Sequence, residues 1–229
     1  MTTKAQFLGR VRASLNQALV PDASPEHPGS FQGYVQPFDT PGEQLVDRFK
    51  QELEALSGRV YVLASPDEAS QTILHIMRQR NATNIISWQA EALGLPGLRE
   101  TLQAAGITIS SEHLPAQGEA RRSKLADIDD VKVGLTGALG GLADTGAVAL
   151  VSGPGRSRLA SLLPPVHIAL LPRTSLYPSL PAFLAAHPET TAQGSNLVFI
   201  AGPSRTADIE LTLTMGVHGP AEIHVIIVP

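Results

Sequence analysis

The stretch Val60-Tyr-Val-Leu-Ala-Ser-Pro-Asp-Glu68 decides the fold class, because it joins a strand directly to a helix. Its apolar first half predicts a buried strand over residues 60–64. Pro66 suits the first position of a helix, and the two acids that follow it favour the positive end of the helix dipole. A buried strand that leads at once into a helix is typical of an α/β protein.

The same alternation of helices and strands extends in both directions from this stretch. Upstream, four large apolar residues recur at helical spacing before Gly58: Leu45, Phe49, Leu53 and Leu56. Downstream, the sequence predicts helices ending near Asn81 and Ala105, and strands over residues 85–87, 107–109, 131–136, 147–152, 167–171, 197–201 and 223–228. The predicted fold is therefore α/β, an open and mainly parallel sheet flanked by helices.

Residues 1–41 are predicted to form an N-terminal helix and arm, and residues 42–229 the α/β domain. Apolar residues at three- and four-residue spacing predict an amphipathic helix over residues 3–19. The segment 21–42 contains five prolines and three glycines, which disfavour both a helix and a central strand. Because Phe31 and Phe38 lie in it, we expect an extended arm that packs on the main body or on a second subunit, rather than a free tether.

Composition excludes several classes of protein. The chain of 229 residues has a formal net charge of −4 and no concentrated basic face, which argues against nucleic-acid binding. It contains no cysteine, and so no disulfide, no thiolate nucleophile and no cysteine ligand for zinc or an iron–sulfur cluster. With neither a secretory signal nor an apolar stretch of roughly 20 residues, it is expected to be a cytoplasmic protein without a membrane span. The charged segment 117–130 is interpreted as a solvated connection or helix face rather than a binding patch.

Four turns follow or join the predicted C-terminal strands, and ligands of open α/β sheets bind at the carboxyl ends of strands. In the first turn, Asp144, Thr145 and Gly146 suit a ligand loop, although a hairpin connection with a capping Asp explains them equally well. In the second, Gly153-Pro-Gly-Arg-Ser-Arg158, backbone N–H groups and Arg156 are candidates for binding an anion, although exposed arginines often serve only solubility. The third, residues 173–175, is a weaker candidate of the same kind.

The fourth turn, Gly202-Pro-Ser-Arg-Thr-Ala-Asp208, is the most specific of these segments. We expect Ser204 or Thr206 to cap a helix that contains Ile209, Leu213 and Met215 and ends at Gly216. Other main-chain N–H groups, beginning at Gly202, would then be available to a carboxylate or phosphate.

Charged side chains of this segment add to its binding capacity. Arg205 provides a forked donor, while Asp208 either complements the helix dipole, orients Arg205 or accepts a substrate hydroxyl. His218 lies in the following turn and is either an acid/base group or a cap for a helix carbonyl. His167 and His224 lie within predicted strands and are expected to be core or surface residues rather than metal ligands. No closely spaced set of His, Asp and Glu predicts a metal site.

The C-terminal half resembles the LUD domain family, in its lactate utilization protein C type. The resemblance is carried by Gly141-Leu-Ala-Asp-Thr-Gly-Ala-Val-Ala-Leu150, Leu163-Pro-Pro-Val-His-Ile168, and above all by Gly202-Pro-Ser-Arg-Thr-Ala-Asp-Ile-Glu210 followed by Gly216-Val-His-Gly-Pro220. In the first of these motifs Asp144 stands where the family has Glu, and Ala147 where a hydroxyl residue is common.

The resemblance implies an open α/β sheet similar to that shared by formyltetrahydrofolate cyclo-ligase, ribose-5-phosphate isomerase and CoA transferases. It also implies a part in the oxidation of L-lactate to pyruvate, alongside separate iron–sulfur subunits. The chain has no cysteine and no Gly-x-Gly-x-x-Gly after a strand, so it has no evident electron acceptor or cofactor of its own. Catalysis by this chain alone is therefore not expected.

Three hypotheses follow. The favoured one is a non-redox component of a lactate-oxidising assembly, in which Ser204, Arg205 and Thr206 bind a small anionic ligand near His218. The second is a stand-alone ligase- or isomerase-like enzyme that acts on a phosphate-bearing small molecule. The third is an assembly protein without a ligand, whose arm engages a partner subunit or a second copy of the chain.

Overall fold

The structure is a computed structural model that describes residues 3–17, 42–110, 115, 117–190, 194–207 and 213–229. The chain divides into two compact units, residues 1–35 and residues 36–229. The first contains helix α1 (Lys4–Gln17), which confirms the N-terminal helix predicted from the apolar spacing. The predicted arm falls almost wholly on residues 18–41, which lie outside the described residues.

The second unit is built on a parallel sheet of six strands in the order β1-β12-β7-β4-β2-β3. All five pairings between neighbours are parallel, which confirms the α/β prediction. The strands are β1 (Arg59–Val62), β2 (Asn84–Ser87), β3 (Thr108–Ser110), β4 (Val133–Gly137), β7 (Val166–Pro172) and β12 (Glu222–Val228). The last strand of the chain, β12, thus lies between the first strand and β7, so residues far apart in the sequence meet in the sheet.

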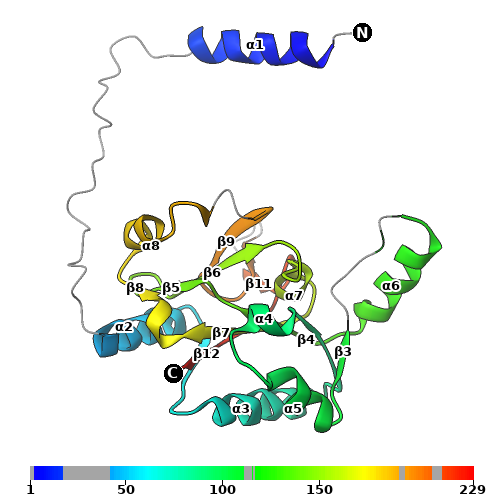
Figure 1. The fold of residues 1–229 in the computed structure, drawn as a ribbon, viewed down its shortest axis with the longest axis vertical. Helices are drawn as coiled ribbons and strands as arrows, with labels where there is room; N and C mark the ends of the chain where they lie inside the picture. The colour runs from blue at the N-terminus through cyan, green and yellow to red at the C-terminus, as the bar shows by residue number, and fades with distance from the viewer. Residues whose placement is uncertain (1–2, 18–41, 111–114, 116, 191–193, 208–212) are drawn as a thin grey trace. The chain divides into compact units, whose positions relative to one another are not determined.

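Helices connect these strands and cover both faces of the sheet (Figure 1). They are α2 (Gly42–Ala55), α3 (Pro66–Gln79), α4 (Ala90–Leu93), α5 (Leu98–Ala104), α6 (Glu119–Asp129), α7 (Leu159–Leu162), α8 (Leu180–Ala186) and the 3-10 turn η2 (Arg173–Ser175). As predicted, α3 begins with Pro66 in its first turn, after Ser65, and the chain leaves the helix through Asn81, whose φ is 49°. The short helix α4 was not predicted.

Alternate residues of the central strands point to opposite faces, and each face has its own helices. Ile226, Val228 and Ile168 pack in one cluster with Ile73 of α3 and Leu102 of α5. The intervening residues pack in a second cluster around α2, which contains Val225, Ile227, Ala169, Phe49 and Leu53. Because both faces are buried, the central strands are mostly apolar, and the polar exceptions include Thr136, His167 and His224.

A second, mixed sheet lies on the α2 side of the parallel sheet and has the order β8-β5-β6-β9 (Figure 1). Its strands are β5 (Gly140–Leu142), β6 (Ala147–Ser152), β8 (Leu176–Tyr177) and β9 (Asn196–Ile200). The strands predicted at 147–152 and 197–201 exist, and they belong to this second sheet, which was not predicted. Residues 143–146 are too few for a parallel crossover, so β5 and β6 pair antiparallel as a hairpin.

Two other predictions meet different outcomes. The strand at 60–64 was expected to be buried, but β1 is an edge strand in which Val60 is buried and Val62 is 40% exposed. The segment 117–130 contains helix α6, and its exposure agrees with the expected solvated face, because Ile128 is the one residue of α6 that is buried.

The close packing of α7 on the sheet depends on Gly134 in β4. A Cβ atom at this position would lie 1.7 Å from the backbone oxygen of Ala160 and 3.2 Å from Pro164. Backbone atoms cannot move aside as a flexible side chain can, so α7 can approach the sheet this closely only over a glycine.

We therefore expect Gly134→Ala to lower the free energy of unfolding by about 3 kcal/mol or more, because α7 must shift away from β4. Gly42→Ala is the matched control, since a Cβ there meets nothing within 4 Å. Urea denaturation measures both variants. Equal stability of the two would contradict the close approach described for α7.

Candidate functional site

The two halves of the most specific motif come together in the structure. The backbone N–H of Ser204 donates to the carbonyl of Pro220 at 2.8 Å, and the N–H of Gly216 donates to the carbonyl of Ser204 at 2.9 Å. A Cβ at Gly219 would lie 3.4 Å from the Cβ of Ser204, so the two turns are in van der Waals contact. Residues 202–206 and 216–220 therefore form one paired-turn site.

The helix predicted after this turn is wrong, because the described residues at both ends of the predicted segment form strands. Strand β10 (Arg205–Ala207) pairs antiparallel with β11 (Leu213–Met215), with Thr206 opposite Thr214. Ser204 and Thr206 therefore do not cap a helix at this point. Asp208 and Ile209 lie outside the described residues. The spacing of apolar residues predicted a helix here, but pairing of two short segments through backbone hydrogen bonds prevails.

The site also lies at the opposite edge of the parallel sheet from the one expected. Residues 216–220 immediately precede β12, so they lie at its amino end, whereas ligands were expected at the carboxyl ends of the strands. Arg205 likewise contacts Leu56 and Ser57, which precede the amino end of β1. The reason is topological: residues 202–206 follow β9, which belongs to the mixed sheet.

Arg205 fastens the paired-turn site to the C-terminal end of α2. Its Nη2 donates to the carbonyl of Leu56 and, at 3.1 Å, to Oγ of Ser57. A helix ends with carbonyls that lack partners within the helix, so this guanidinium caps α2. Ser57 has a φ of 70°, and Gly202 packs 3.2 Å from the Cβ of Leu56, measured from an ideal Cβ position. Arg205 is therefore a positioning residue, whatever else it binds.

His218 and Ser204 are the polar side chains that this anchoring leaves at the turns. His218 is exposed, and Ser204 is half-buried beside Gly219. An imidazole and a hydroxyl carried by two cross-linked turns can donate to a small carboxylate or exchange a proton with it.

The turn with Asp144, Thr145 and Gly146 packs on the same helix as Arg205. Gly146 has a φ of 64°, and a Cβ there would lie 2.4 Å from the backbone nitrogen of Leu53. The hairpin reading of this turn is confirmed, since it connects β5 to β6. Arg48, whose charge acts on Asp144, precedes Leu56 by eight residues, which is about 12 Å along the helix. The turn with Asp144 and the paired-turn site therefore meet different parts of α2.

Asp144 is an unusual carboxyl in this turn. Its Oδ1 is buried and has no hydrogen-bond partner in the described part of the chain. Burial raises the pKa of Asp144; a hydrogen bond with Thr145 and the charge of Arg48 oppose the rise, and the charge of Glu52 adds to it. A carboxyl in this setting holds a proton more readily than a solvated one.

The second and third turns do not join the paired-turn site. Gly153 and Arg156 exchange backbone hydrogen bonds of 3.1 and 2.9 Å, so these N–H groups are already satisfied within the turn. Arg173 forms an ion pair of 3.1 Å with Glu43 at the start of α2. The backbone N–H groups of Gly153 and Arg156 and the side chain of Arg173 are therefore already paired. Neither turn contacts residues 202–206 or 216–220 through a hydrogen bond among the described residues.

Two buried histidines are core residues, as expected, but the sequence did not reveal their partners. His167 is fully buried, and its Nε2 lies 2.9 Å from Oγ1 of Thr136 on β4. Burial, and to a lesser extent the charge of His224, lowers the pKa of His167 to about 3.

His224 belongs to a chain of polar groups near the amino end of β12. Its Nδ1 lies 3.2 Å from the hydroxyl of Tyr61, and its Nε2 lies 3.4 Å from Glu222, which forms an ion pair with Arg80. Burial lowers the pKa of His224, and hydrogen bonding to Glu222 opposes that shift. The only sequence signal for this network was polar residues at alternate positions of a predicted strand.

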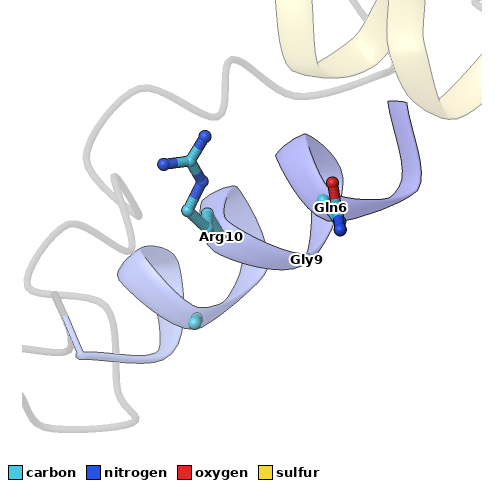
Figure 2. Close-up of a pocket in the computed structure, with 4 residues that line it drawn as sticks. Gln6, Gly9 and Arg10 are labelled. Carbon is cyan, nitrogen blue, oxygen red and sulfur yellow. The ribbon is translucent and has the colours of Figure 1, made fainter. Parts of the chain in front are cut away.

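Two hollows on the described surface share no lining residue with the paired-turn site, and one of them is lined by Leu45 of α2, Tyr177 of β8 and Ala182 of α8 among others. Figure 2 shows a hollow whose described lining, Gln6, Gly9, Arg10 and Ala13, is one face of α1 alone. Within the described residues, no group of three His, Asp or Glu side chains comes together to hold a metal ion. Of the helices that the structure describes, none combines the length and the apolar character needed to span a membrane.

Fold and site together define an α/β protein with a parallel sheet, a mixed sheet on one face, and a paired-turn site at the amino ends of β1 and β12. The family model of the LUD domain matches residues 46–228. The chain therefore belongs to the LUD domain family.

Individual relatives agree with this assignment. Lactate utilization protein C of Halalkalibacterium halodurans is 34% identical over 166 residues, 71% of this chain and 70% of the relative. Lactate utilization protein C of a Geobacillus species is 28% identical over 202 residues, 86% of this chain and 81% of the relative. The crystal structure of a DUF162 family protein from Deinococcus radiodurans has a TM-score of 0.60 at 18% identity and covers 83% of this chain and 99% of that one. This last likeness shows the fold alone.

Replacing Arg205 with Gln is expected to release the paired-turn site from α2. The loss of the charge-assisted bonds to Leu56 and Ser57, discounted for exposure, should cost about 1 kcal/mol of unfolding free energy and increase proteolytic cleavage within residues 202–216. Arg78→Gln on α3 is the control, because this exposed side chain forms no ion pair in the described residues. Indistinguishable proteolysis patterns for the two variants would refute the anchoring role.

The buried histidines predict a loss of stability in mild acid. The unfolded chain binds a proton at His167 near pH 6.5, but the folded chain does so only near pH 3. The contribution of neutral His167 to the free energy of unfolding is therefore fully present above pH 6.5 and decreases as the pH falls below it. His167→Gln should remove up to about 1.4 kcal/mol per pH unit of this slope between pH 6 and 4. Denaturant titrations at several pH values measure it, with His75→Gln as the exposed control. An unchanged slope in His167→Gln would exclude a neutral buried imidazole.

Proposed function

We propose that the chain is a component of a lactate-utilization system. The observation that carries the proposal is the similarity to lactate utilization protein C of Halalkalibacterium halodurans, which extends over 70% of that protein at 34% identity. The Geobacillus relative of the same name is matched over a still larger share of its length.

Within that system, we propose that this chain is not the redox subunit. Oxidation of lactate to pyruvate requires an electron acceptor, and a chain without cysteine cannot ligate an iron–sulfur cluster in the ordinary way. The electron-transferring clusters would then belong to partner subunits.

The paired-turn site is the part of this chain that we propose binds a small carboxylate. Both hydrogen bonds described for Arg205 use Nη2, so the other edge of the guanidinium can donate to an anion while the anchor stays in place. His218 on the adjoining turn and Ser204 next to Arg205 supply a second and a third donor. A carboxylate bound there would be oriented by side chains on two turns that backbone hydrogen bonds already hold together, so neither turn would have to rearrange.

The experiment that tests this function is growth of the native host on L-lactate. Deletion of the gene should reduce growth on L-lactate at least tenfold and leave growth on pyruvate unchanged. Restoring the chain with His218→Gln should rescue poorly, whereas His75→Gln, an exposed histidine on α3, should rescue fully. Full rescue by His218→Gln would remove His218 from the proposed site.

A pull-down from cells grown on lactate tests the partners separately. Co-purifying protein should carry the absorption spectrum of iron–sulfur clusters. If no such protein accompanies the chain, and calorimetry instead shows tight binding of a nucleotide or sugar phosphate, the stand-alone enzyme becomes the better hypothesis.

A further inference from the structure

Apart from Glu119 in its first turn, helix α6 carries its charges in an order that does not stabilise the helix itself. Its N-terminal half contains Arg121, Arg122 and Lys124, and its C-terminal end contains Asp127 and Asp129. Cations oppose the positive N-terminal end of the helix dipole, and anions oppose the negative C-terminal end. The helix dipole therefore does not explain this order of charges, and contacts outside the helix have to be considered.

The rest of the described chain explains only one of these charges, because Arg121 donates to the carbonyl of Pro115 at 3.1 Å. Only Ile128 of α6 is buried, and in Figure 1 the helix extends away from the sheet. None of the ion pairs within the described residues involves a side chain of α6. A helix that is polar nearly all round and lacks such pairs needs a further source of stability.

One stripe of α6 is complementary to itself. Arg122, Leu125, Ala126 and Asp129 are exposed and lie at positions i, i+3, i+4 and i+7, on one face of the helix. Leu125 is 38% exposed, although it lies at the centre of this stripe. Asp129 has no cation three or four residues before it and so cannot pair within the helix.

We propose that this stripe of α6 docks antiparallel on the same stripe of a second copy of the chain. In that arrangement each Arg122 meets Asp129 of the second copy, and each Leu125 meets Ala126 of the second copy. A large and a small apolar residue face each other twice at the centre, and an ion pair closes each end.

The charge pattern favours a second copy over an unrelated partner. The order of residues along the stripe is basic, apolar, apolar, acidic. In an antiparallel pair the second copy presents the reverse order, so each charge faces the opposite charge, as a two-fold symmetric interface requires. Antiparallel pairing also opposes the two helix dipoles favourably, and it sets each basic half against an acidic half. The contact spans two turns of one helix, well below the area of a standard interface, so the dimer forms weakly and depends on concentration.

Charge reversal tests the pairing by analytical ultracentrifugation of the full chain over a range of concentrations. Arg122→Asp alone and Asp129→Arg alone should each weaken self-association at least tenfold. The double variant should regain it, and an equimolar mixture of the two single variants should associate with each other. Failure of both the double variant and the mixture to associate would overturn the proposal, as would a monomeric parent chain.

The absence of cysteine allows an independent test by cross-linking. Ala126→Cys places one thiol at the predicted two-fold axis, and Ala120→Cys places one on the opposite face of the same exposed helix. Under mild oxidation, Ala126→Cys should form a covalent dimer at least tenfold faster than Ala120→Cys. Equal rates would exclude the antiparallel stripe contact, and circular dichroism confirms that both variants are folded.

Discussion

The packing of α2 against the face of the sheet that carries Val225 and Ile227 is the interaction on which the site depends. Phe49 and Leu53 are fully buried in this contact, each worth about 1.5–3 kcal/mol of transfer free energy. The same helix then receives three loops along its length: Arg173 at Glu43, Gly146 at Leu53, and Arg205 at Leu56. Loops from both sheets are thereby held in one fixed relation to α2.

The histidines near the amino ends of the strands divide into two kinds by burial. His167 and His224 are enclosed in the sheet, where desolvation lowers the pKa of each and keeps the imidazole neutral. His218 is exposed on a turn that backbone hydrogen bonds connect to Ser204. Of these three histidines, only His218 can therefore reach a solute, whereas His167 and His224 are paired with Thr136 and with Tyr61 inside the sheet.

Strong local patterns predicted most elements correctly, and the failures share one cause. The helix that begins at Pro66 and the strand of residues 223–228 were found because capping chemistry and continuous apolar runs act within a few residues. The helix expected after Ser204 was wrong because β10 and β11 stabilise each other by pairing. Such pairing cannot be predicted from the residues of either segment alone. The burial predicted for β1 was wrong because its place at the sheet edge depends on which strand pairs beside it.

The sequence by itself determined the fold class, the identity of the motif residues Arg205 and His218, and the absence of cysteine chemistry, since each of these is a property of residue type and short spacing. Only the tertiary structure decided that the motif lies at the amino ends of the strands and that Arg205 caps α2. The physical reason is connectivity: the chain leaves the parallel sheet for the mixed sheet and returns through β12, so neighbours at the site are set by strand pairing over distances that local pattern cannot convey.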